Sequence, residues 1–150
     1  MSSLPHHYTV VTSCSSNGNL LTTGSNLPAL DVAPPTNFGG PGNLWSPEDL
    51  LVASASTCLI LSFKAVARMS NFNWLMIDCE TEGVLDKVDR LMQFTRLDSR
   101  VHLVIPSCPD KDAARETAGK LLEKAEATCL VSNSLKCPVH LSYEIEFAGG

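Results

Sequence analysis

The chain has 150 residues, a length that favours one domain with a true hydrophobic core, and its 44% hydrophobic and 18% charged residues argue against disorder. Its net charge of −5 argues against nonspecific nucleic-acid binding. Six cysteines are too few for a disulfide scaffold, and the first seven residues lack the basic start and apolar run of a signal peptide. We therefore expect a single cytoplasmic domain, residues 1–150, with reduced cysteines.

The first part of the chain has β character. Residues 7–14 and 20–23 are expected to form strands, and Asn17-Gly18 between them is a typical two-residue hairpin turn. The Pro- and Gly-rich segment 27–43 predicts a long loop or an interrupted edge strand. A loop this long and stiff either lines a pocket or simply connects elements at the surface.

The chain is organised around residues 46–70, which carry strong signals for the start of a helix. Ser46 can cap the first backbone N–H groups, and Pro47 suits the first helical position. Glu48 and Asp49 place negative charge at the positive end of the helix dipole. Ser46 and Asp49 also approximate a capping box. A helix is therefore predicted over this whole segment.

The middle of this helix is unusual in composition. Residues 50–63 carry no charge and are apolar or small on nearly every side, which is typical of a helix surrounded by protein. The uncharged run is too short to span a membrane, which needs roughly 20 residues. Cys58 lies at its centre, where a cysteine is most often an inert small hydrophobe.

The remainder of the chain predicts alternating strands and a second helix. The expected elements are strands over residues 75–85, 91–97, 100–105 and 137–147, a turn over 86–89 and a helix over 109–127. Apolar residues of that helix recur at helical spacing. The last strand alternates apolar and polar residues, as half-buried antiparallel strands do. The order βββ-α-βββ-α-β predicts an α+β domain with largely antiparallel sheets.

Two cysteines stand out by their setting, Cys58 in the central helix and Cys129 in the connector after the second helix. The phrase S-P-E-D-L-L-V-A-S-A-S-T-C, followed about seventy residues later by A-E-A-T-C-L-V-S-N-S-L, resembles the OsmC/Ohr family of thiol-dependent organic hydroperoxide reductases. Glu48 matches the family's glutamate, Cys58 its helix cysteine and Cys129 its second cysteine. Ser132 and Asn133 complete the family's Cys-x-x-Ser-Asn pattern.

The resemblance implies an OsmC-like fold, with antiparallel sheets around two central helices, in an intertwined homodimer with active sites at the subunit interface. Glu48 and Cys58 on one helix would be about 15 Å apart along its axis. A site that uses both would therefore take the glutamate from a second chain.

The chemistry implied by the resemblance has two steps and needs no cofactor or metal. The Cys58 thiolate attacks an organic hydroperoxide and becomes a sulfenic acid, and Cys129 condenses with it to a disulfide. A lipoyl-type dithiol then reduces the disulfide. Glu48 would be a polar positioning group. No nucleic acid or membrane takes part.

The sequence departs from the family pattern in two places. Burial raises a thiol pKa, so a buried thiolate must be stabilised, and family members supply an arginine from the segment before the central helix. Residues 1–63 contain neither Arg nor Lys, and Leu130 follows Cys129 where Pro is common in the family. The candidate substitutes are Arg96, Arg100 and Lys136, with His102 and His140 as weaker options.

Three functions stay open: a thiol peroxidase, a non-catalytic dimer that binds a small ligand, and a general thiol or disulfide oxidoreductase. A cation within about 4–6 Å of the Cys58 sulfur would favour the peroxidase, and an apolar surround would favour the binding protein. Cys137 could compete as the resolving thiol. Its C-x-x-H spacing to His140 invites a zinc site together with Cys129, but no paired C-x-x-C supports one.

Overall fold

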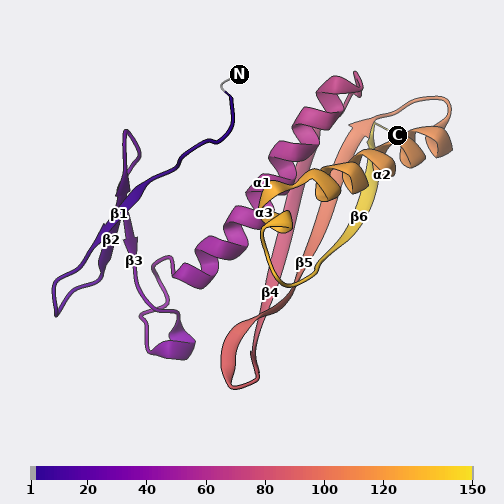
Figure 1. The fold of residues 1–150 in the computed structure, drawn as a ribbon. Helices are drawn as coiled ribbons and strands as arrows, with labels where there is room; N and C mark the ends of the chain where they lie inside the picture. The colour runs from indigo at the N-terminus through magenta and orange to yellow at the C-terminus, as the bar shows by residue number, and fades with distance from the viewer. Residues whose placement is uncertain (1–2, 150) are drawn as a thin grey trace. The chain divides into compact units, whose positions relative to one another are not determined.

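The computed structural model describes residues 3–149 and divides into two compact units, one up to residue 51 and the other from residue 52. Each unit contains one three-stranded sheet, β1-β2-β3 in the first and β4-β5-β6 in the second (Figure 1). The helix α1 (Pro47–Met69) begins in the first unit and continues in the second.

The first unit confirms both predicted N-terminal strands. Its elements are β1 (Val10–Ser13), β2 (Leu20–Gly24), β3 (Leu30–Val32) and the 3-10 helix η1 (Thr36–Phe38). All three strands pair antiparallel. The expected two-residue hairpin turn at Asn17-Gly18 is wrong, because residues 14–19 form a longer connection. The Pro- and Gly-rich segment is the predicted interrupted edge strand, since β3 and η1 both lie within it.

A complete capping box starts α1 as predicted. The Asp49 N–H donates to the Ser46 Oγ over 3.1 Å, and the Ser46 N–H donates to the Asp49 carboxylate over 3.2 Å. The Ser46 hydroxyl also donates to the same carboxylate oxygen over 2.8 Å. Ser46 is fully buried, so these bonds replace the water that its polar groups lose. Aspartate therefore does here what glutamate usually does in this motif.

We expect Ser46→Ala to lower the free energy of unfolding by about 1–2 kcal/mol, because it removes the hydroxyl that accepts from the Asp49 N–H and donates to the Asp49 carboxylate. Urea denaturation followed by circular dichroism measures the change. Ser107→Ala, at an exposed position, is the control and should stay within about 0.5 kcal/mol of the original chain. Equal stabilities of the two variants would contradict the assigned cap.

The second unit holds the longer strands and two further helices. Its remaining elements are β4 (Met76–Val88), β5 (Leu91–Pro106), α2 (Lys111–Thr128), α3 (Leu130–Asn133) and β6 (Val139–Ala148). The strand β4 continues through the turn predicted at 86–89, and the chain reverses instead at Asp89 and Arg90, with φ of 50° and 72°. Two successive positive φ values are the mark of a tight hairpin turn.

The prediction of two separate strands, 91–97 and 100–105, is wrong, because β5 is one continuous strand. Asp98 and Ser99, the residues between the two predicted strands, are both polar. Ser99 is only 2% exposed, however, and its hydroxyl lies 2.9 Å from that of Thr81, the residue opposite it on β4. This cross-strand hydrogen bond lets a polar residue continue a buried strand.

The prediction that the last strand is antiparallel is also wrong, because β6 pairs parallel to β5. Alternation of apolar and polar residues indicates which face of a strand is buried, but it does not indicate the direction of the strand. The helix α2 lies between β5 and β6 in the chain, and such a crossover is what parallel pairing needs.

The core of the second unit lies between the two long helices and one face of its sheet. It contains Leu59, Phe63, Val66 and Ala67 of α1, Val101, Leu103 and Ile105 of β5, and Ala118, Leu121, Leu122 and Ala125 of α2. The β5 and α2 residues are on the faces that residue periodicity predicted, whereas the sequence of α1, apolar on nearly every side, predicted burial but no single face. Leu61 of α1 lies outside this core and is 64% exposed. By length and composition α1 is also apolar enough to cross a membrane, a test that core helices pass as well.

Candidate functional site

Cys58 and Cys129 are held in place by different local structures. Cys58 lies within α1, next to the fully buried Leu59. Cys129 is fully buried and forms the break between α2 and α3. Its N–H donates to the Glu126 carbonyl over 3.2 Å, and its carbonyl accepts from the Asn133 N–H over 3.0 Å. These bonds place the thiol between the two helices.

The structure brings these two thiols together. The Cys58 and Cys129 side chains lie within hydrogen-bonding reach, although they are far apart in the sequence, and both are free thiols. The spacing of the two residues did not show this proximity, which depends on the packing of α1 against the end of α2. Two of the three predicted site residues therefore form one cluster.

The pKa of Cys58 lies below its usual value because hydrogen bonds outweigh burial. Burial is the largest influence and raises the pKa, but the backbone N–H of Val131, the Cys129 thiol, the Ser62 hydroxyl and the backbone N–H of Leu130 all lower it. Each of these groups can donate to a thiolate, and hydrogen bonds to the ionised form favour that form. Neutral donors thus stabilise the Cys58 thiolate.

The pKa of Cys129 is shifted in the opposite direction. Burial raises it most, and the Cys58 sulfur raises it further, while the hydroxyl and backbone of Ser132 lower it by less. Two neighbouring titratable groups with opposite shifts are suited to different chemical tasks. The surroundings therefore favour the ionised form at Cys58 and the protonated form at Cys129.

Glu48, the third predicted site residue, lies in the first turn of α1. It is ten residues before Cys58 on one helix, or about 15 Å along the axis, so the helix itself does not bring the two together. Its Oε1 is buried and has no hydrogen-bond partner within residues 3–149. A buried carboxylate oxygen that accepts no hydrogen bond costs free energy, and buried polar atoms in proteins usually have a hydrogen-bond partner.

Four of the five candidate substitutes for the missing arginine have acidic partners on the second sheet. Arg96 lies 3.0 Å and His140 lies 3.3 Å from the Asp98 carboxylate. Arg100 lies 2.7 Å from the Glu80 carboxylate. His102 lies 3.5 Å from the carboxylates of both Asp78 and Glu146. None of the four is among the groups in the described part of the chain that shift the pKa of Cys58. In the described part of the chain, the groups that lower the pKa of Cys58 are therefore neutral donors and not these cations.

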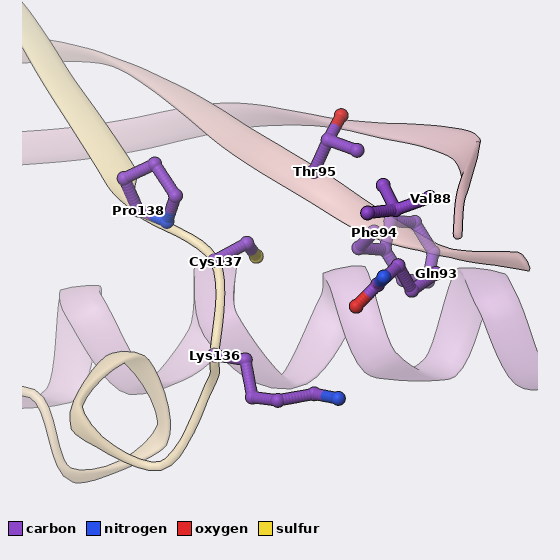
Figure 2. A pocket seen from close by; sticks show the side chains of 7 residues that line it. All are labelled: Val88, Gln93, Phe94, Thr95, Lys136, Cys137 and Pro138. Atoms are coloured by element: carbon purple, nitrogen blue, oxygen red, sulfur yellow. The ribbon is translucent and has the colours of Figure 1, made fainter. Parts of the chain in front are cut away.

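The fifth candidate, Lys136, lines a pocket of about 250 Å³ (Figure 2). The residues that line it are Val88, Gln93, Phe94, Thr95, Lys136, Cys137 and Pro138. Cys137 therefore lines a pocket that neither Cys58 nor Cys129 lines. Among residues 3–149, no group of three or more His, Cys, Asp or Glu side chains could hold a metal ion, so the zinc alternative lacks a ligand set.

The sequence alone did not point to the donors around Cys58. Ser62 follows Cys58 by one helical turn, a spacing that could have marked it as a partner. The N–H groups of Leu130 and Val131 carry no signal, because every residue except proline has one. The leucine at position 130, where proline is common in the family, matters because a proline has no backbone N–H to donate to Cys58.

We expect Leu130→Pro to raise the pKa of Cys58, because it removes one N–H donor while proline is tolerated at the first position of a helix. At a pH below the pKa of Cys58, the loss of a hydrogen bond that stabilises the thiolate by about 1.4 kcal/mol lowers the thiolate fraction about 10-fold. Alkylation of Cys58 at neutral pH should therefore slow by about 10-fold. Leu130→Ala keeps the N–H and trims a side chain that is 71% exposed, so it is the matched control. Alkylation resolved by peptide mass spectrometry measures both, and equal rates in the two variants would exclude the Leu130 amide as a donor.

Comparison with known proteins identifies the family and the fold. The family model for OsmC-like protein matches residues 40–144. The uncharacterized protein YmaD of Bacillus subtilis is 26% identical over 85% of this chain and 79% of its own. Peroxiredoxin OsmC of Escherichia coli is 28% identical over 67% of each chain.

A solved structure extends the similarity to nearly the whole chain. The organic hydroperoxide resistance protein OsmC from Legionella pneumophila covers 96% of this chain and 99% of its own, with a TM-score of 0.71 and 21% identity. The two sheets and few helices described above are therefore a mixed α+β OsmC-like fold. Because the family model matches well over half of its residues, this chain belongs to the OsmC-like protein family.

Proposed function

We propose that this protein is a thiol peroxidase that reduces organic hydroperoxides, with Cys58 as the attacking thiol and Cys129 as the resolving thiol. One observation carries the proposal: two adjacent thiols whose pKa values are shifted in opposite directions, Cys58 down and Cys129 up. The names of the relatives, a peroxiredoxin and an organic hydroperoxide resistance protein, support it.

In the first step, the Cys58 thiolate attacks the distal oxygen of a hydroperoxide ROOH. The O–O bond breaks, an S–O bond forms, and the leaving alkoxide takes a proton to become the alcohol, so Cys58 is oxidised to a sulfenic acid while the peroxide is reduced. In the second step, the Cys129 sulfur attacks the Cys58 sulfur, and the sulfenic oxygen leaves as water. A dithiol of the lipoyl type then reduces the Cys58–Cys129 disulfide by exchange.

The proposal includes a cytoplasmic homodimer in which Glu48 acts in the site of a second copy. Its support is the distance of about 15 Å between Glu48 and Cys58 on one helix, the Glu48 Oε1 without a partner in residues 3–149, and the exposed Leu61 on α1. An apolar face of a central helix is the kind of surface that a second copy covers.

The test is to mix fully reduced protein with one equivalent of a bulky alkyl hydroperoxide and to map its thiols by mass spectrometry over seconds to minutes. The proposal expects a Cys58–Cys129 disulfide that forms faster than with hydrogen peroxide. A third sample receives a small organic disulfide. If the thiols react with that disulfide and not with the peroxide, the protein is a thiol–disulfide oxidoreductase. If both cysteines stay reduced for minutes in every sample, the protein is not a peroxidase.

A further inference from the structure

Cys129 lies at a sharp break between two helical segments. It ends α2 and begins α3, and its own backbone is extended, with φ of −67° and ψ of 110°. The helix α3 is a single turn of four residues that follows the end of α2 directly (Figure 1). A helix this short is not stable by itself, so its position depends on contacts with neighbouring segments.

The Asn133 side chain supplies such a contact across the break. Its Nδ2–H group donates to the Ala127 carbonyl over 3.1 Å. Ala127 is in the last turn of α2, where carbonyl groups have no partner within the helix. The backbone N–H of Asn133 donates to the Cys129 carbonyl over 3.0 Å. One residue of α3 is therefore bonded both to the end of α2 and to the residue that carries the thiol.

The thiol itself takes no part in fastening α3. An N-cap side chain usually accepts a hydrogen bond from the first turn of its helix. Cys129 is the N-cap of α3, but its side chain makes no capping hydrogen bond within residues 3–149. The fastening comes instead from the other end of α3, at Asn133. The Cys129 sulfur is thus left available for Cys58.

The second step of the proposed reaction depends on where this sulfur is held. Cys58 is fixed within the long helix α1, whereas Cys129 is on a short connection between helices. The two sulfur atoms must meet at bonding distance and in the right direction, and holding reacting groups in that geometry accelerates a reaction. The accuracy of the approach therefore depends on the bonds that hold the connection.

We propose that Asn133 is a positioning residue for the second step: its side-chain amide holds α3 against the end of α2 and so fixes the approach of the Cys129 sulfur to Cys58. This inference rests on the proposed function. In that step the Cys129 sulfur bonds to the Cys58 sulfur, the S–O bond of the sulfenic acid breaks, and the sulfenic OH leaves as water with the Cys129 proton. Asn133 exchanges no atom or electron with either sulfur.

The test follows the second step after rapid mixing with one equivalent of alkyl hydroperoxide. A sulfenic-acid trap measures the oxidation of Cys58, and mass spectrometry measures the disulfide. Asn133→Leu keeps the size and branching of the side chain but removes its N–H donor. We expect it to slow disulfide formation by about 3- to 10-fold, the effect of about one hydrogen bond. Thr128→Ala is the matched control and should stay within about 2-fold of the original chain, because the Thr128 hydroxyl donates to the Lys124 carbonyl within α2.

Two further readouts distinguish positioning from other effects of the substitution. Asn133→Gln keeps an amide donor and should recover part of the rate. At alkaline pH, where the thiols ionise in every variant, the slowing in Asn133→Leu should persist, because the position of the sulfur is altered and not its charge. Equal rates in Asn133→Leu and the original chain, full recovery at alkaline pH, or equal slowing in Thr128→Ala would each overturn the inference.

If the original chain forms no sulfenic acid, the proposed function itself fails, and exchange with dithiothreitol then tests Asn133 without any peroxide. Poorly placed thiols form a less stable disulfide. We therefore expect the Cys58–Cys129 disulfide of Asn133→Leu to be half reduced at a ratio of reduced to oxidised dithiothreitol about 3- to 10-fold lower than in the original chain. An unchanged ratio would overturn the inference.

Discussion

Replacing Cys58 by serine is expected to reduce peroxide turnover by at least about 1,000-fold, because the thiolate is the nucleophile and a serine hydroxyl does not ionise near neutral pH. The donors that lower the pKa of Cys58, among them the Val131 N–H and the Ser62 hydroxyl, would remain but would have no thiolate to stabilise. Serine is nearly isosteric with cysteine, so the helix and the core around Leu59 should persist.

The measurement is the consumption of an alkyl hydroperoxide in the presence of a dithiol. Circular dichroism and the Tm would verify that the Cys58→Ser protein is folded. Cys14→Ser is the control, because Cys14 is exposed in the first unit. Full turnover by Cys58→Ser protein would exclude the mechanism and would direct attention to the four cysteines outside the Cys58–Cys129 pair.

Replacing Cys129 by serine should have a different effect, namely a single oxidation event per site followed by a stop. Cys58 keeps its two backbone donors and Ser62, so its sulfenic acid should still form. Without a second thiol no disulfide follows, and excess peroxide should carry Cys58 on to the sulfinic acid. With one equivalent of peroxide, the expected readout is one equivalent of alcohol per chain and a trapped sulfenic acid at Cys58.

This variant also decides between two resolving thiols. Cys137 lies after α3 and lines the pocket with Phe94 and Lys136, whereas Cys129 is beside Cys58. We therefore expect no Cys58–Cys137 disulfide in the Cys129→Ser protein. Sustained turnover by that protein would contradict the assignment of Cys129, and its loss in a Cys129→Ser, Cys137→Ser double variant would assign the task to Cys137.

The sequence by itself determined the elements that depend on local interactions. The start of α1 was predictable because Ser46 and Asp49 satisfy each other's backbone groups within one helical turn. The buried faces of α2 and β5 were predictable because residue periodicity matches the period of each element. The motifs around Glu48, Cys58 and Cys129 were enough to indicate the family that the comparisons then showed.

The tertiary structure alone decided the features that depend on contacts between distant segments. Alternation in β6 could not reveal its parallel direction, and the polar Ser99 continues β5 only because Thr81 lies opposite it. The same holds for the chemistry of the site. The sequence suggested a missing cation, but the groups that lower the pKa of Cys58 include backbone N–H groups of Leu130 and Val131. Backbone donors are identical in nearly every residue, so only the packing of α3 against α1 shows where they act.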